Sequence, residues 1–259
     1  MQAIQGFLDE LHHYAGINTP LVSEAVAVAS DLRAYLKEVT ENDLGMCSSL
    51  LFESPTSALN FLLKTTQNKE LAKTKEELLE MLLDFIKQIG VKGVSTYAVS
   101  IGDACFSVFR SDQTSKVKTM CLPVIIKLVR MKIATLTAEN FRVHSKVETL
   151  LTELAYNKNT QTVKGNILQT LGVLAEHFPE HLVGQAKTLL VMLSDLLSEQ
   201  FKDKKPDYQV IDGGMRGLIS LLVHFSGEVT SDPKKVATIW RFTLACLNPP
   251  EGLKTYVIP

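Results

Sequence analysis

The chain has 259 residues, of which 46% are hydrophobic and 21% charged, and its formal net charge is −1. This balance is typical of a folded globular protein. It excludes a surface that is basic throughout, so any contact with nucleic acid is expected in a local patch. No stretch approaches the ~18 apolar residues of a membrane span, and the N-terminus does not resemble a secretory signal.

Four cysteines are scattered along the chain without a CxxC pair, at Cys47, Cys105, Cys121 and Cys246. This pattern favours reduced thiols, as in the cytosol or nucleus, over a disulfide framework.

The elements predicted in chain order are all helices. Residues 3–39 predict a first helical pair, interrupted at Asn18-Thr19-Pro20. Residues 40–56 are expected to be irregular and residues 58–64 to form a short helix. Further helices are expected over 71–90, 96–110, 116–132, 138–156, 207–225 and 233–247. The stretch 160–201 predicts two amphipathic helices with a corner at Pro179, because proline lacks an N–H and disfavours the helical conformation before it.

The helices follow a regular period. First helices start near residues 71, 116, 160 and 207, with two helices in each unit, and the spacing lies in the ~40–47 residues of HEAT or armadillo repeats. We therefore predict an all-α fold, a HEAT-like helical-repeat solenoid (an α-α superhelix). A helical region, 1–70, would precede repeats over 71–259. A closed helical bundle is the alternative.

The C-terminal stretch carries an apolar stripe, Leu253, Tyr256, Val257 and Ile258, that stops at Pro259. Terminal repeats of a solenoid normally carry a polar outer face. We therefore expect the repeat array to be truncated at this end.

Two motifs resemble sites of known chemistry. His177, Glu180 and His181 spell H-x-x-E-H, whose zinc chemistry needs both histidines one turn apart on one helical face. Pro179 bends the chain inside this motif, which favours a polar turn. The glycine-rich stretch at Gly213, Gly214 and Gly217 lacks the Lys-Ser/Thr pair and the preceding strand of a phosphate loop, which favours close packing of helices. No catalytic, cofactor-binding or metal-ligating residue is nominated.

Basic residues gather at the starts of helices and in one loop. Lys116 and Lys118 lead into a helix that carries Lys127, Arg130 and Lys132, and other lysines open the helix at 234–235. Repeat loops tend to line up along one edge of a solenoid, where cations can meet a phosphate backbone and release counterions. The alternative is that these are ordinary solvated loops. The candidate contacts to DNA or a partner are Lys116, Lys118, Lys202, Lys204 and Lys205.

Several stretches together resemble a known family. They are LAKTKEELLEMLLDFIKQIG, TYAVSIGDACFSVFRSDQTSKVK, ILQTLGVLAEHFPEH, GGMRGLISLLVHFS and DPKKVATIW with LKTYVIP. In order and spacing they resemble the extreme N-terminus of a giant serine/threonine kinase of the phosphatidylinositol 3-kinase-related kinase family. The resemblance runs from about Leu71 to Pro259, and it rests on length and order rather than on short motifs.

The resemblance implies an arm of HEAT-like repeats in a parent kinase whose catalytic domain, with its ATP and Mg²⁺, lies at the far C-terminus. It implies that the arm helps to form a ring that receives a DNA end presented by the Ku heterodimer, during double-strand break repair by non-homologous end joining in the nucleus. The implied partners are Ku, double-stranded DNA ends and the remainder of the parent chain, with no membrane.

None of the kinase signatures occurs here: the sequence has no glycine-rich loop with its following lysine, no H-R-D catalytic loop and no D-F-G. We therefore expect no catalytic site and no cofactor in this segment. The alternative hypothesis is a self-contained helical-repeat adaptor that binds a protein partner in its groove and needs no DNA. A zinc hydrolase at 177–181 is the enzyme alternative.

Overall fold

The computed structural model describes residues 2–17, 21–156, 159–202 and 207–225, with seven further positions between 227 and 241. Within these ranges every regular element is helical. The chain divides into two compact units, Met1–Phe141 and Arg142–Pro259. The predicted domain division at residue 70 stays a prediction, and these units are divided elsewhere.

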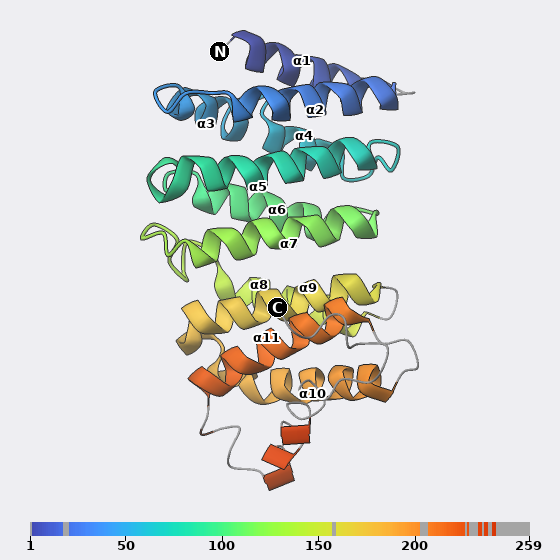
Figure 1. Cartoon of the computed structure of the whole chain (residues 1–259), viewed down its shortest axis with the longest axis vertical. Coiled ribbons are helices and arrows are strands. Elements are labelled where there is room, and N and C mark those ends of the chain that lie inside the picture. The colour runs from blue at the N-terminus through green and yellow to red at the C-terminus, as the bar shows by residue number, and fades with distance from the viewer. Residues whose placement is uncertain are drawn as a thin grey trace. The chain divides into compact units, whose positions relative to one another are not determined.

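The first unit is built from antiparallel helices in two layers. Helices α2, α5 and α7 lie side by side in one layer, and α4 and α6 lie in the other (Figure 1). Helix α1 packs against both α2 and α4. The bounds are α1 Gln2–Gly16, α2 Val22–Lys37, α3 Leu44–Phe52, α4 Ala58–Lys64, α5 Ala72–Val94, α6 Ala98–Ser111 and α7 Ser115–Arg130.

Two predicted elements of this region differ in the structure. The stretch 40–56 was expected to be irregular, but it contains the helix α3, whose Cys47, Leu51 and Phe52 are buried. Burial of these apolar groups outweighs the weak helix propensity of Gly45 and the two serines in the segment. The helix expected over 138–156 starts at Val143, because the residue before it, Arg142, has a left-handed backbone with φ 51° and ψ 49°.

The core of the first unit contains a buried ion pair. The ammonium group of Lys75 on α5 contacts the carboxylate of Asp112 at the end of α6, and both side chains are fully buried. Lys75 Nζ also donates to the carbonyl of Thr65 at 3.2 Å, and the other carboxylate oxygen of Asp112 accepts from the Thr114 N–H at 2.8 Å. The pair therefore joins α5, the α4–α5 turn and the α6–α7 turn.

The second unit contains α8 (Val143–Ala155), α9 (Gln161–His177), α10 (Ala186–Lys202) and α11 (Tyr208–His224). The hydroxyl of Thr160 caps α9 by accepting from the Val163 N–H at 3.4 Å. The predicted corner at Pro179 is confirmed, and two short 3-10 turns, Pro179–His181 and Val183–Gln185, make the connection to α10.

Glycines allow α9 and α11 to approach closely. A Cβ added at Gly213 would lie 2.1 Å from the carbonyl oxygen of Gly165, and one at Gly172 would lie 2.7 Å from the Cα of Gly217. Any side chain at Gly213 or Gly172 would therefore meet the backbone of the opposing helix. An added Cβ at Gly214 would lie 2.9 Å from Leu197, and one at Gly217 would lie 3.0 Å from the Leu168 carbonyl oxygen. The predicted role of Gly213, Gly214 and Gly217 in helix packing is therefore confirmed.

Both units are stacks of helical hairpins, so the predicted all-α, helical-repeat fold class is confirmed. The expected helix at 233–247 lies mostly outside the described residues, and the apolar stripe at 253–258 lies entirely outside them. Among the described helices none is both long and apolar enough to cross a bilayer.

Candidate nucleic-acid interface

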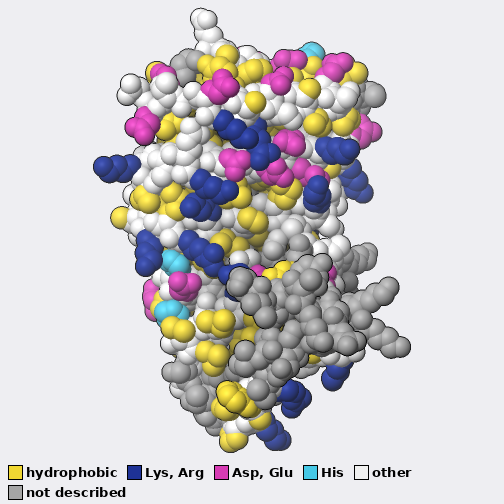
Figure 2. Space-filling view, in the orientation of Figure 1, with side chains coloured by type: hydrophobic (Ala, Val, Ile, Leu, Met, Phe, Trp, Pro, Cys, Tyr) yellow, Lys and Arg dark blue, Asp and Glu magenta, His cyan; other side chains and the backbone are white. Residues whose placement is uncertain are grey.

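Charge is divided unevenly along the first unit. Residues 1–84 contain thirteen Asp and Glu against six Lys and Arg, whereas residues 85–141 contain three Asp and Glu against eight Lys and Arg. In Figure 2 the carboxylates gather over α1, α2 and α5, while Lys and Arg gather over the α7 region. The near-neutral chain therefore contains a local basic surface.

Helix α7 supplies the first part of this surface. Its sequence, SKVKTMCLPVIIKLVR, contains no acidic residue. Lys127 and Arg130 follow Lys116 by about three and four helical turns, which places the three on one face. The opposite face is buried through residues such as Cys121, Ile125 and Val129. Packing of this apolar stripe therefore turns the cations of α7 outward.

The end of α5 supplies the second part. Gly90 adopts φ 64° and ψ −169° and interrupts α5, so that Lys92 lies in a short final turn. The Ser95 hydroxyl donates to the Lys92 carbonyl at 3.0 Å, and the Thr135 hydroxyl donates to the Ser95 carbonyl at 2.7 Å. These bonds hold the end of α5 against the loop that follows α7, which carries Lys132.

We call Lys92, Lys127, Arg130 and Lys132 the basic edge. Lys92, Arg130 and Lys132 are exposed and Lys127 is half-buried. In the part of the chain that the structure describes, none of the four forms an ion pair with a carboxylate. Their charges are thus available to an external anion.

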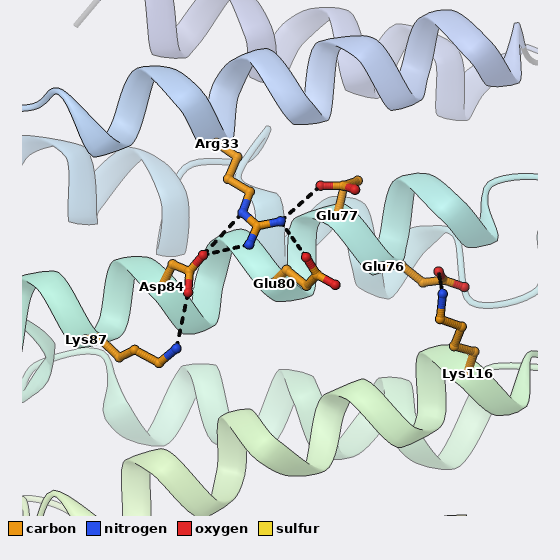
Figure 3. Close-up of polar contacts among 7 residues, drawn as sticks. All are labelled: Arg33, Glu76, Glu77, Glu80, Asp84, Lys87 and Lys116. Carbon is orange, nitrogen blue, oxygen red and sulfur yellow. Dashed lines mark hydrogen bonds and ion pairs between the residues drawn. The ribbon is translucent and has the colours of Figure 1, made fainter. Parts of the chain in front are cut away.

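Figure 3 shows an acidic ridge on α5, together with the cations that pair with it. It consists of Glu76, Glu77, Glu80 and Asp84 on α5. Arg33 on α2 reaches across to three of them: its guanidinium contacts Glu80, lies 3.3 Å from Glu77 and lies 2.8 Å from Asp84.

These contacts have electrostatic consequences. The hydrogen bond to Asp84 raises the pKa of Arg33. Burial opposes ionisation of Asp84, but hydrogen bonds from Arg33 and Lys87 lower the pKa of that carboxyl. Asp84 therefore remains ionised, and Arg33 joins α2 to α5.

Two predicted contact residues have partners within the protein. Lys116 forms an ion pair of 2.5 Å with Glu76, whose side chain is only 15% exposed, and this hydrogen bond raises the pKa of Lys116. Lys118 lies with its Nζ 5.8 Å from the ring centroid of Phe109, in a cation–π contact. Since one leans toward α5 and the other toward α6, the two lysines do not point toward a single ligand.

The remaining predicted contacts belong to the second unit. Lys202 is exposed at the C-terminal end of α10. Lys204 and Lys205 lie outside the described residues. The role of all five lysines stays a prediction.

The H-x-x-E-H stretch lacks the geometry of a zinc site. Helix α9 ends at His177, whose Nδ1 lies 3.0 Å from the carbonyl of Val173, and His181 closes the 3-10 turn that follows. The two histidines are therefore not one turn apart on a helix. Over the described residues no group of three or more His, Cys, Asp or Glu is arranged to hold a metal ion.

The three thiols in the described part of the chain offer no reactive centre either. Cys47, Cys105 and Cys121 are free and buried, and burial raises the pKa of Cys105 to about 12 and that of Cys121 well above its ordinary value. Because the thiolate is the nucleophile and metal ligand, these protonated thiols serve packing.

Fold and site together define a helical-repeat protein that presents a localised basic surface. The family model described as "DNA-PKcs, N-terminal" matches residues 45–259. The chain belongs to this family, the N-terminal region of the DNA-dependent protein kinase catalytic subunit, which confirms the resemblance in the sequence.

Curated relatives agree with this assignment. The DNA-dependent protein kinase catalytic subunit of Dictyostelium discoideum is 34% identical over 86% of this chain. Those of Mus musculus and Xenopus laevis are 29% and 28% identical over 82% and 83% of it. The chain spans about 5% of the length of each of these relatives.

A solved structure titled "Structural Basis of Microtubule Plus End Tracking by XMAP215, CLIP-170 and EB1" contains a chain with a TM-score of 0.48 and 19% identity. The match covers 91% of this chain and 89% of that chain. Similarity at this level is too distant for a functional argument.

Proposed function

We propose that the chain is the N-terminal HEAT-like arm of a DNA-dependent serine/threonine kinase. The arm scaffolds the recognition of DNA ends together with Ku, in the nucleus, during repair by non-homologous end joining. It contributes no chemistry of its own, and ATP and Mg²⁺ belong to the kinase domain of the parent protein. The proposed contacts are Lys116, Lys118, Lys202, Lys204 and Lys205, to which we add the basic edge.

The observation that carries the proposal is the basic edge in a chain of this family. Four cations that have no carboxylate partner among the described residues lie beside a surface rich in Asp and Glu. A duplex phosphate backbone is attracted to the first surface and repelled by the second, so the charge division favours one orientation of DNA on the first unit. Such contacts position a duplex without reading its sequence.

The test is binding of the purified chain to a blunt DNA duplex across a salt series, with and without Ku. We expect the variant Lys92→Gln/Lys127→Gln/Arg130→Gln to bind roughly tenfold more weakly at low salt, because three phosphate contacts are lost. The slope of log affinity against log salt should fall by about 1 for each side chain that contacts a phosphate.

The matched control is Lys64→Gln/Lys69→Gln/Lys73→Gln, which removes the same charge from exposed lysines of the acidic half. This control should keep most of the affinity and the salt slope. Equal losses in both variants would mean that DNA responds only to net charge. No binding at any salt, with or without Ku, would favour the adaptor that needs no DNA.

A second prediction concerns Lys116. The variant Glu76→Gln removes the carboxylate that holds the ammonium group of Lys116 and frees this lysine for phosphate. We expect tighter DNA binding and a salt slope that is steeper by about 1. The double variant Glu76→Gln/Lys116→Gln should return to the wild-type slope. If it binds as tightly as Glu76→Gln alone, the gain comes from the general loss of negative charge and not from Lys116.

A further inference from the structure

Lys132 has a backbone conformation that a lysine rarely adopts. Its φ is +52°, and over the described residues only one other non-glycine residue, Arg142 at the start of the second unit, has a positive φ. Lys132 is the first residue after the C-cap of α7, where many helices end on a left-handed glycine. A side chain in this conformation destabilises the folded chain, because its Cβ crowds the backbone.

The surroundings hold Lys132 in place from both sides. Its N–H donates to the carbonyl of Val129 at 3.1 Å, which closes the end of α7. After it, Ile133 and Leu136 are buried, and the hydroxyl of Thr135 is bonded to the α5–α6 turn. Strained residues persist when neighbouring packing determines them in this way, and they gather at functional sites.

The structure of the helix end does not itself require a lysine here. A cation near a helix C-terminus interacts favourably with the helix dipole. Lys127 and Arg130 already lie in the last turn of α7 and supply this interaction. At Gly90, on the same edge, φ 64° with ψ −169° is a conformation open essentially to glycine alone. The positive φ of Lys132 also favours glycine, but the chain has a lysine there. Lys132 thus keeps a charged side chain where glycine would relieve the backbone.

We propose that Lys132 is a phosphate-contact residue of the basic edge, and that its charge is kept at the expense of folding stability. The ligand class is the phosphate backbone of double-stranded DNA, so the inference rests on the proposed function. The buried anchors Ile133 and Leu136 fix the position of the Lys132 Cα before DNA arrives. Less conformational freedom is then lost on binding than for a lysine on a loose loop.

The test pairs stability with DNA binding in the 259-residue chain. In Lys132→Gly, the melting temperature should rise by about 2–4 °C as the strain is relieved. The same variant should bind a blunt duplex several-fold more weakly, with a salt slope smaller by about 1. Lys132→Asn, which tolerates the left-handed region, should behave similarly. Lys132→Arg should keep the wild-type slope.

The melting temperature is expected to rise while the DNA affinity falls. Misfolding would lower both, so it cannot produce the expected result. The inference is overturned if Lys132→Gly binds DNA with the affinity and salt slope of the wild type. It is also overturned if this variant melts at a lower temperature, because the residue would then be unstrained. Failure of the wild type to bind DNA at any salt, with or without Ku, would remove the proposed function and this inference together.

Discussion

Replacing Asp112 with alanine is expected to lower the free energy of unfolding of the first unit by about 3–5 kcal/mol. The change leaves the fully buried ammonium group of Lys75 with the Thr65 carbonyl as its remaining hydrogen-bond partner among those described. It also leaves the Thr114 N–H without its carboxylate acceptor. Urea unfolding followed by far-UV circular dichroism, with hydrogen exchange of α5–α7 to locate the loss, measures the effect.

Two further variants test whether the loss of stability in Asp112→Ala comes from the broken Lys75–Asp112 pair. Asp31→Ala removes an exposed carboxylate from α2 and should change stability by less than about 0.5 kcal/mol. The double variant Lys75→Met/Asp112→Leu replaces both charges by apolar groups and should recover most of the lost stability. A loss below about 1 kcal/mol in Asp112→Ala would show that water reaches the pair.

The parts of the fold that follow local rules could be predicted from the sequence. The end of α1 at Gly16 and the start of α2 at Val22 lie on either side of the predicted break, and α9 ends at His177, just before Pro179. Proline lacks the N–H that a continuing helix would bond. The helix α3 could not be predicted in this way. Its nine residues show no clear periodicity, and they become helical because the body of the unit buries Cys47, Leu51 and Phe52. A short segment stabilised by tertiary contacts leaves little signal in its own sequence.

The positive charges of the candidate site could be predicted from the sequence, but the contacts that these side chains make in the structure could not. Lysines are visible in a sequence, whereas the carboxylate that holds Lys116 belongs to Glu76, forty residues earlier on α5. Lys118 likewise meets Phe109 of another helix. Lys92 was not among the candidates, although the sparse acidic residues of 85–141 are a signal that a count by segment would have found. The left-handed backbone of Lys132 needed the structure, since it depends on the buried anchors that follow.

The second unit depends on close contact between α9 and α11, and Gly213→Ala tests this contact. The new methyl group would lie 2.1 Å from the carbonyl oxygen of Gly165, well inside van der Waals contact. The atoms nearest to the new methyl group all belong to the backbone of Gly165 in α9. No side chain can rotate away to make room, so the two helices must separate. Overpacking of this kind costs about 1–3 kcal/mol and occasionally more, and we expect a loss at the upper end of that range.

Thermal unfolding, with hydrogen exchange of α9 and α11, measures the loss in Gly213→Ala. The matched control is Gly6→Ala in α1, where an added Cβ meets nothing within 4 Å. Because alanine is the better helix former, this control should be stabilised by up to about 1 kcal/mol. If Gly213→Ala is also stabilised, helix propensity outweighs packing at this position and the two helices do not touch in solution. If it is destabilised while Gly6→Ala is not, the glycine-rich stretch serves the close approach of two helices and not the binding of phosphate.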